Sequence, residues 1–355
     1  MRASGVLWLA AIVLVGGVLL PGCGEEGGGK VIPSQDGGAV HLKTIAKGKT
    51  PSVAYLTNGV ASFWTIAQSG AQQGAREAHA TVDVRMPSGV VNQKEMIQDL
   101  LTRGVDGIAI SPIDPANQVE IINKACTVTN VITHDSDAPG THRLCYIGMD
   151  NYKAGRMCGA LVKEAIPNGG MVMIFIGRLE QDNARRRRQG MIDEVLGRDY
   201  DPMRYDPPGK ELKSGDYTIL GTLTDQFDRA QGKANVEDAI SRYPELDCMV
   251  GLFAYNPPLM LEVLKQAGKL GAIKVVGFDE ADETLQGIKD GTVYGTVVQN
   301  PFEYGRQSVI MLAALARGDA SVLPEGGFVD IPARQIRPDN VDAFWAELKK
   351  NLGKR

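Results

Sequence analysis

Three polar side chains follow a short apolar segment at residues 131–133 of this 355-residue chain. The segment is β-branched and suits a buried parallel strand, and Asp135, Ser136 and Asp137 stand where that strand ends. In open α/β sheets the ligand crevice lies outside the carboxyl ends of the strands. Charged side chains there are costly to remove from water unless a partner pairs with them. We therefore expect a polyhydroxylated small molecule as their partner.

Other predicted strands also end in side chains with carboxyl, amide or hydroxyl groups, namely Asn58, Ser111, Asp114, Asn256, Asp279 and Gln299. Such groups supply donors and acceptors that suit adjacent sugar hydroxyls. The rings of Phe63, Trp64 and Phe227 can stack on the C–H face of a sugar. One arginine of the run at residues 185–188 can add a charge-assisted hydrogen bond. These residue types predict a site for a monosaccharide or a polyol.

Other chemistry has less support in the sequence. His134 lies beside Asp135 and Asp137, but the two-residue period of a strand places it on the opposite face, so we expect no metal site. Asp135 and Asp279 resemble the paired carboxylates of a glycoside hydrolase, yet no catalytic motif accompanies them, and we expect no enzyme. Neither a dinucleotide-binding glycine motif nor a phosphate loop follows any predicted strand, so we expect no cofactor. The net charge of −4 argues against a nucleic-acid partner.

Structural roles remain open for several of these residues. Asp135 also suits a turn at a strand end. Asn256 precedes two prolines and also suits a helix N-cap. Gln299 can serve a hinge hydrogen bond alone, and Phe63 and Trp64 can pack in the core at a helix start.

Short apolar strands alternate with amphipathic helices from residue 51 onward, and these elements must position the polar residues. Such alternation calls for parallel sheets covered by helices on both faces. One series ends near residue 151 and a second follows, so the predicted fold class is α/β with two doubly wound parallel-sheet lobes. The proline-rich stretch 199–213 predicts a surface excursion. Residues 337–355 predict a terminal helix that packs through Phe344 and Trp345.

Residues 1–23 predict a lipoprotein signal peptide that lies outside the fold. An apolar run at residues 6–20 has the length of a signal-peptide core, and it ends in the sequence LPGC at Cys23. That ending matches a bacterial lipobox with Cys23 as the lipidated residue, and an ordinary secretion signal is the alternative. Lipid there would hold the protein at a membrane, while the glycine-rich residues 24–49 predict a flexible linker. We expect an exported, lipid-anchored protein of the cell envelope.

Export permits disulfide bonds among the other four cysteines. Cys126 closes a predicted helix, and Cys145 opens the strand after the acidic segment. We predict a bridge between them that holds the intervening loop. Cys158 and Cys248 stand in apolar settings and are predicted to be buried free thiols.

Seven motifs follow one another along the chain: the aromatic pair Phe63 and Trp64, then GIAISPID, VITHDSDA, YIGMDNYKAGR, FAYN, VVGFDE and VVQNPFEYG. With them, the chain from about residue 51 to 334 resembles the ribose-type (cluster B) sugar-binding proteins of bacterial ABC transporters. The resemblance implies the type I periplasmic binding protein fold, in which two lobes joined by a multi-strand hinge close on a sugar.

The resemblance also implies roles for single residues. Phe63 and Trp64 match two rings that sandwich the sugar, and Asp135 matches an aspartate that binds its hydroxyls. Matches on the second lobe and the hinge are Arg187, Phe227, Asn256, Asp279 and Gln299. Asn58 and Ser111 join this set only across a gap in the alignment.

One position departs from the ribose binders, which have Arg directly after the aspartate. This chain has Ser136 there, followed by Asp137. Replacing a fork of donors by a hydroxyl and a carboxylate changes which hydroxyls are accepted. We therefore expect Ser136 and Asp137 to contact a ligand other than ribose, such as a different pentose or hexose, a polyol or an amino sugar.

The predicted first lobe comprises residues 50–151 and 300–329, and the second comprises residues 152–299 and 330–336. We expect a monomeric binding protein that delivers its ligand to the permease of an ABC importer. A sugar sensor that presents its ligand to a membrane receptor or a histidine kinase is the alternative, because the sequence does not separate the two roles.

Overall fold

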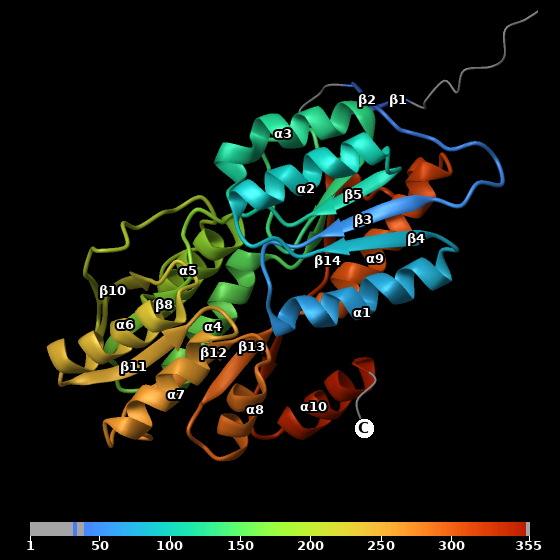
Figure 1. The fold of residues 1–355 in the computed structure, drawn as a ribbon. Helices are drawn as coiled ribbons and strands as arrows, with labels where there is room; N and C mark the ends of the chain where they lie inside the picture. The colour runs from blue at the N-terminus through green and yellow to red at the C-terminus, as the bar shows by residue number, and fades with distance from the viewer. Residues whose placement is uncertain (1–30, 34–38, 353–355) are drawn as a thin grey trace, which may run out of the picture.

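The computed structural model describes residues 31–33 and 39–352 and divides them into two α/β lobes (Figure 1). The predicted signal peptide with Cys23 lies outside the described residues. Strands β1 (Val31–Pro33) and β2 (Ala39–His41) pair antiparallel ahead of the first lobe. Leu42 then packs in the first-lobe core, and the N–H of Ile45 donates to the carbonyl of Ala316 (2.8 Å). The prediction of a free linker up to residue 49 is therefore wrong from residue 42 onward, because an apolar side chain anchors this stretch.

A six-stranded parallel sheet forms the first lobe, in the order β14-β7-β6-β5-β3-β4. Its strands are β3 (Ser52–Leu56), β4 (Thr81–Arg85), β5 (Gly107–Ile110), β6 (Asn130–His134), β7 (Tyr146–Gly148) and β14 (Phe328–Asp330). One face is covered by α2 (Val90–Arg103) and α3 (Pro115–Val128), and the other by α1 (Ser62–Glu77) and α9 (Pro301–Ala316) (Figure 1). Because both faces are covered, every residue of β5 and β6 is buried, which explains their apolar runs.

A seven-stranded sheet forms the second lobe, in the order β15-β13-β12-β11-β8-β10-β9, with only the two edge strands antiparallel. Its strands are β8 (Gly170–Ile176), β9 (Leu212–Ser214), β10 (Tyr217–Thr224), β11 (Leu246–Gly251), β12 (Lys274–Phe278), β13 (Gly295–Val298) and β15 (Arg334–Ile336). Its helices are α4 (Asn151–Ala165) and α5 (Asp182–Val195) on one face, and α6 (Arg229–Arg242), α7 (Asn256–Gln266) and α8 (Asp282–Lys289) on the other. The predicted α/β class with two doubly wound lobes is confirmed.

The chain crosses between the lobes three times: after β7, after β13 and between β14 and β15. Two short 3-10 helices, Ala320–Val322 and Glu325–Gly327, precede β14. The last helix, α10 (Val341–Asn351), packs on the second lobe through Phe344, and Trp345 Nε1 donates to Asp282 Oδ1 (2.9 Å). The predicted packing of the terminal helix through these two aromatic residues is confirmed.

Glycines allow the helices on one face of each sheet to pack very closely. A Cβ atom at Gly305 of α9 would lie 2.0 Å from the carbonyl oxygen of Ala67 in α1. At Gly190 of α5, it would lie 2.0 Å from the carbonyl oxygen of Tyr152 in α4. Both contacts are with backbone, which cannot rotate away as a side chain can. Close packing thus fixes α1 and α5, the helices that carry the predicted ligand residues Phe63, Trp64 and Arg187.

The predicted bridge between Cys126 and Cys145 is wrong, because both thiols are free and buried. Cys126 packs with the α2 and α3 side chains on one face of the first-lobe sheet. Cys145 belongs to the cluster under α1 and α9 on the opposite face. The two thiols therefore pack in different hydrophobic clusters and do not pair with each other. Cys158 and Cys248 are also free and buried, as predicted.

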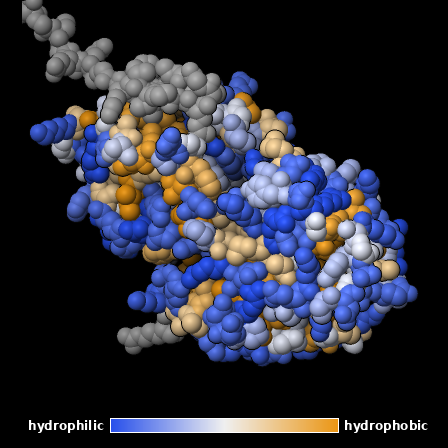
Figure 2. Space-filling view, turned by 180° about the vertical axis from the view of Figure 1, so that it is seen from behind, coloured by the Kyte–Doolittle hydropathy of each residue, from blue (hydrophilic) through white to orange (hydrophobic). Residues whose placement is uncertain are grey.

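The surface seen from behind is mostly hydrophilic, with hydrophobic residues in separate patches (Figure 2). Within residues 31–33 and 39–352, no helix combines the length and the apolar character that crossing a membrane requires.

Candidate ligand-binding site

A cavity of ≈ 730 Å³ lies between the two lobes. Its walls come from the loops after β3, β4, β5 and β6 in the first lobe and after β8, β10, β11, β12 and β13 in the second. These loops follow the carboxyl ends of parallel strands, where open α/β sheets bind their ligands. The volume falls within the roughly 300–1,000 Å³ of small-molecule sites. This interlobe cleft is therefore the candidate ligand-binding site.

Asp135 lies directly after β6 and lines the cleft. Its backbone is left-handed, with φ 57°, a conformation that Asp tolerates better than most residues. One carboxylate oxygen, Oδ2, accepts hydrogen bonds from Asn58 Nδ2 (3.3 Å), Ser111 Oγ (3.1 Å) and Asn183 Nδ2 (3.2 Å). Asn183 belongs to α5, so this carboxylate joins the two lobes. No donor from the described residues reaches the other oxygen, which leaves it available to a ligand hydroxyl.

Asp279 holds the equivalent place after β12 in the second lobe, with φ 66°. Its Oδ1 accepts from Gln299 Nε2 (2.7 Å), and its Oδ2 lies 3.9 Å from Arg187 Nη1. Gln299 stands at the crossing between β13 and α9, where its Oε1 accepts from the hydroxyl of Tyr304 (3.2 Å). Gln299 therefore serves both the cleft and the hinge.

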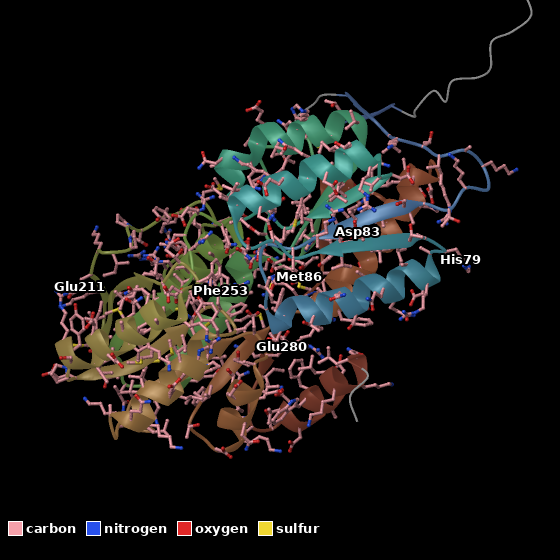
Figure 3. The ribbon with its side chains drawn as sticks, viewed as in Figure 1. His79, Asp83, Met86, Glu211, Phe253 and Glu280 are labelled. Atoms are coloured by element: carbon pink, nitrogen blue, oxygen red, sulfur yellow. The ribbon has the colours of Figure 1, made fainter. Side chains whose placement is uncertain are left out.

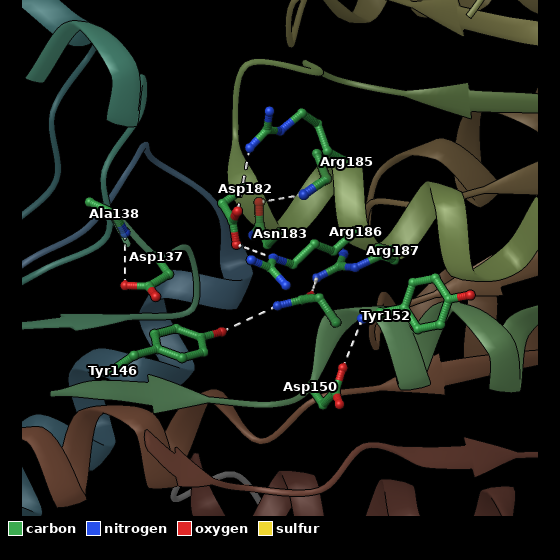
Figure 4. A network of polar contacts seen from close by, with 12 residues as sticks. Asp137, Ala138, Tyr146, Asp150, Tyr152, Asp182, Asn183, Arg185, Arg186 and Arg187 are labelled. Atoms are coloured by element: carbon green, nitrogen blue, oxygen red, sulfur yellow. Dashed lines mark hydrogen bonds and ion pairs between the residues drawn. The ribbon is translucent and has the colours of Figure 1, made fainter. Parts of the chain in front are cut away.

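Arg187 is 1% exposed and is held from several sides. Its Nη1 donates to the carbonyl of Leu252 (2.8 Å), its Nη2 donates to Asn151 Oδ1 (3.2 Å), and its guanidinium carbon lies 3.9 Å from the ring centroid of Phe278. Asn151 Nδ2 in turn donates to the hydroxyl of Tyr146 in β7 (3.2 Å), so the network crosses the lobe boundary (Figure 4). Arg187 Nε has no acceptor among the described residues. This N–H remains available to a ligand in the cleft.

Burial changes the protonation of both aspartates. It raises the pKa of Asp135 to about 7 against the opposing charge of Arg187, and the nearby Asp279 adds to the rise. Burial likewise raises the pKa of Asp279, although Arg187 and the hydrogen bond from Gln299 oppose the change. Loss of water is the dominant cause in each case. Donor groups of a ligand would stabilise the charged form of both carboxylates.

His134 lies away from these carboxylates, as the two-residue strand period predicts. Its ring stacks on Tyr55 with centroids 4.0 Å apart, and Nδ1 lies 3.0 Å from the hydroxyl of that tyrosine. Burial lowers the pKa of His134 to about 3. The histidine is thus a neutral core residue, which contributes nothing to the cleft.

Aromatic rings line both walls of the cleft. Phe63 and Trp64 stand edge to face in the first lobe, with centroids 4.8 Å apart. Phe227, Phe253 and Tyr255 form the second-lobe wall, where Phe227 and Phe253 have centroids 5.4 Å apart. Figure 3 shows Phe253 at the edge of the second lobe that faces the first. Aromatic faces opposite carboxylates suit a ligand with both C–H and hydroxyl surfaces.

Comparison with known proteins identifies the family. The model of the periplasmic binding protein domain matches residues 53–320. The chain belongs to this family. Periplasmic binding proteins are ligand-binding proteins of the cell envelope and carry out no chemistry on their ligands.

Relatives of this periplasmic binding protein are named for sugars and polyols. The ribose import binding protein of Salmonella typhimurium is 24% identical over 72% of this chain and 81% of its own. The D-ribose/D-allose-binding protein of Pseudomonas aeruginosa is 23% identical over 84% of this chain and 91% of its own. The xylitol-binding protein of Mycolicibacterium smegmatis is 24% identical over 84% of this chain and 80% of its own. A Burkholderia graminis ABC transporter solute-binding protein in complex with D-arabinose has a TM-score of 0.74 and 26% identity, covering 83% of this chain and 98% of its own.

Eight predicted ligand residues line the cleft of this periplasmic binding protein: Asn58, Phe63, Trp64, Asp135, Arg187, Phe227, Asp279 and Gln299. Ser111 does not line it, and its hydroxyl instead donates to Asp135 from behind. Seven of the eight follow strand ends or lie in the first turn of a helix, and Arg187 lies in the second turn of α5. Their positions follow from local sequence, which is why they could be predicted.

The structure does not place Ser136 and Asp137, which were predicted to contact the ligand, in the cleft lining. Asp137 forms a buried ion pair with Arg143 and accepts from Thr133 Oγ1 (2.6 Å) and from the N–H of Ala138 (2.7 Å). The Ser136 hydroxyl is buried beside it without a hydrogen-bond partner among the described residues. A buried carboxylate needs such partners, and here the protein supplies them. The departure from ribose binders at these positions thus shapes the loop behind Asp135.

Asn256 also lies outside the cleft lining, so its predicted contact with the ligand stays a prediction. Its Oδ1 accepts from the N–H of Phe253 (3.0 Å), and its Nδ2 donates to Asp225 Oδ2 (3.3 Å). Asn256 therefore shapes the loop that presents Phe253. The residues of this loop that line the cleft are Phe253, Ala254, Tyr255 and Pro258.

The cleft residues that sequence reasoning missed include Arg178, Asn183, Phe253 and Tyr255. Arg178 and Phe253 each follow a second-lobe strand by two residues, so their place after β8 and β11 was a usable indication. Asn183 offered none, because its contact with Asp135 joins segments from different lobes.

Proposed function

We propose that this periplasmic binding protein captures a monosaccharide or a polyol in the interlobe cleft and delivers it to an ABC importer. The observation that carries the proposal is the placement of Asp135 and Asp279, each at the end of a central strand, between aromatic walls of the two lobes. Each carboxylate can accept from ligand hydroxyls while the rings cover the C–H faces. Relatives named for ribose, allose and xylitol support the same ligand class.

Ligand capture proceeds by closure of the lobes about the hinge. Contacts from Trp64 and Asp135 on one side, and from Arg187 and Asp279 on the other, exist together only when the cleft is closed. The ligand therefore stabilises the closed form, and the permease distinguishes the closed protein from the open one.

The proposal includes a lipid anchor at Cys23. The LPGC sequence after an apolar run supports it, and a diacylated cysteine would keep the protein beside the permease. The test is fractionation of cells that express the wild-type chain or a Cys23→Ser variant. We expect the wild type with the membranes and the variant in the soluble fraction; equal distribution of the two would reject the anchor.

A thermal-shift screen of monosaccharides and polyols tests the ligand class, with titration calorimetry for each positive compound. Ligand at 100 times its Kd stabilises the folded state by about 2.7 kcal/mol, which raises the melting temperature measurably. An Asp279→Asn variant is the negative control. If no sugar or polyol shifts the melting temperature, the proposed ligand class is wrong. Unchanged sugar uptake after gene deletion would reject the transport role.

A further inference from the structure

Arg178 lines the cleft, and its guanidinium group contacts the ring of Phe227. None of the hydrogen bonds described above involves it. It lies two residues after β8, and its guanidinium carbon stands 5.2 Å from the ring centroid of Phe227. Its Nε is buried and has no hydrogen-bond acceptor among the described residues. An N–H group of a charged side chain, removed from water without a partner, is costly to keep.

Asp225, the acidic residue beside this wall, has hydrogen-bond partners other than Arg178. Asp225 accepts from the hydroxyl of Tyr255, from the N–H of Phe227 (2.9 Å) and from Asn256 Nδ2 (3.3 Å). Asp225 thus holds the aromatic wall together and is 2% exposed. Arg178 forms no ion pair with any residue in the part of the chain that the structure describes.

The other charged groups of the cleft do not neutralise Arg178. Asp279 lies 3.9 Å from Arg187, which offsets its charge. Asp135 receives three neutral donors, and burial raises its pKa to about 7. Arg229 and Glu283 are both exposed at the rim, where water screens them. Arg178 is therefore the half-buried charged side chain of the second-lobe wall that has no ion pair among the described residues.

We propose that the physiological ligand is a sugar or polyol that carries an anionic group, a carboxylate or a phosphate, and that Arg178 binds this group. The inference rests on the proposed sugar-binding function and narrows its ligand class. A neutral hydroxyl would satisfy the Nε–H group and leave the charge unpaired, whereas an anionic oxygen satisfies both. The planar guanidinium suits carboxylate and phosphate, and the Phe227 face restrains its orientation. Because the same cavity is lined by Asp135 and Arg178, one ligand can use its hydroxyls and its anionic group together.

Titration calorimetry with matched ligand pairs tests the inference on the purified protein. The pairs are D-glucuronate against D-glucose, D-gluconate against D-glucitol, and ribose 5-phosphate against D-ribose. We expect at least one anionic member to bind roughly 10- to 100-fold more tightly than its neutral partner, as for a charge-assisted hydrogen bond shielded from water. Comparing the affinities for glucuronate and gluconate with that for ribose 5-phosphate shows whether the site prefers a carboxylate or a phosphate.

Variants separate recognition from a purely structural role of Arg178. In Arg178→Gln, the affinity for the anionic ligand should fall by about 10- to 100-fold, and that for its neutral partner by less than about 3-fold. Arg185→Gln is the matched control, since Arg185 lies on the same lobe outside the cleft lining with its side chain 51% exposed, and both affinities should stay unchanged. An equal loss for both ligands in Arg178→Gln would show that the arginine only supports the Phe227 wall, and would overturn the inference.

The outcomes also separate this inference from the function on which it rests. If neutral sugars bind and no anionic member binds more tightly, the anionic ligand class is rejected and sugar binding stands. If neither class binds the wild type, sugar binding itself is rejected. A melting temperature of ligand-free Arg178→Gln close to that of the wild type confirms that the variant is folded.

Discussion

Asp135 and Asp279 occupy matching positions in the two lobes. Each follows a central strand directly, each has a left-handed backbone, with φ 57° and 66°, and each donates its N–H to the next strand, at Ile147 (3.1 Å) and Val297 (2.8 Å). This conformation costs roughly 1–2 kcal/mol for an L-residue, and such strain is typical of functional positions. The same local geometry, used once per lobe, aims a carboxylate at the cleft from each side.

Replacing either carboxylate by its amide should weaken ligand binding. Asn tolerates the left-handed backbone and has nearly the same size, so Asp135→Asn and Asp279→Asn change only charge and hydrogen bonding. We expect binding about 10- to 100-fold weaker, since a hydrogen bond to a charged group contributes about 1.5–3 kcal/mol. Calorimetry with a ligand from the screen measures this, and Asp290→Asn, outside the cleft lining, is the control. Unchanged affinity in both cleft variants would contradict the site.

The ligand-free protein should gain stability from Asp135 as the pH falls. The folded pKa of Asp135, about 7, exceeds its unfolded value of about 4, so the folded state binds more protons between these pH values. Stability from this group is therefore present at pH 4 and is lost as the pH rises through 7, by at most about 4 kcal/mol. Urea unfolding of wild type and Asp135→Asn from pH 4 to 8 checks the difference. Parallel curves for the two proteins would disprove the raised pKa.

Gly305→Ala should destabilise the first lobe. The new Cβ would lie 2.0 Å from the carbonyl oxygen of Ala67, so α1 and α9 must separate. We expect a loss of about 2–4 kcal/mol in the free energy of unfolding. Gly140→Ala, at a position with no atom within 4 Å of the added Cβ, is the control and should cost less than about 1 kcal/mol. Similar unfolding curves for the two variants would refute the close helix contact.

The four cysteines after Cys23 should remain thiols in the purified protein. Burial raises the pKa of both Cys126 and Cys145 to about 12, so neither forms a reactive thiolate. In a Cys23→Ser chain, a thiol reagent should label none of them in the folded state and all four after unfolding. Dithiothreitol should leave the melting temperature unchanged. Only two thiols after unfolding, or a lower melting temperature with the reductant, would restore the disulfide hypothesis.

Phe253 and Asn256 should respond differently to truncation. Phe253→Ala removes a ring from the cleft wall and should weaken ligand binding about 10- to 50-fold. Asn256→Ala removes two hydrogen bonds behind that wall and should lower the free energy of unfolding by about 1–3 kcal/mol. Calorimetry and urea unfolding of both variants separate the effects. A large loss of affinity in Asn256→Ala at unchanged stability would return Asn256 to the ligand site.

The fold class and eight of the cleft residues could be predicted from the order of residues along the chain. Alternating apolar strands and amphipathic helices admit parallel sheets covered on both faces, and the carboxyl ends of the parallel strands in each sheet then lie at one edge. Asp135 and Asp279 could be predicted because each is adjacent to its strand in the sequence. Their placement needs no knowledge of what else is nearby.

Which neighbours satisfy each polar or apolar group depends on contacts between segments that are distant in the sequence. Asp137 has the same residue type as Asp135, but Arg143 pairs with it behind the cleft. Cys126 and Cys145 pack in separate hydrophobic clusters. The free-energy cost of burying a charge, a thiol or a ring depends on atoms from distant segments. The spacing of residues along the sequence does not show which of these atoms come into contact.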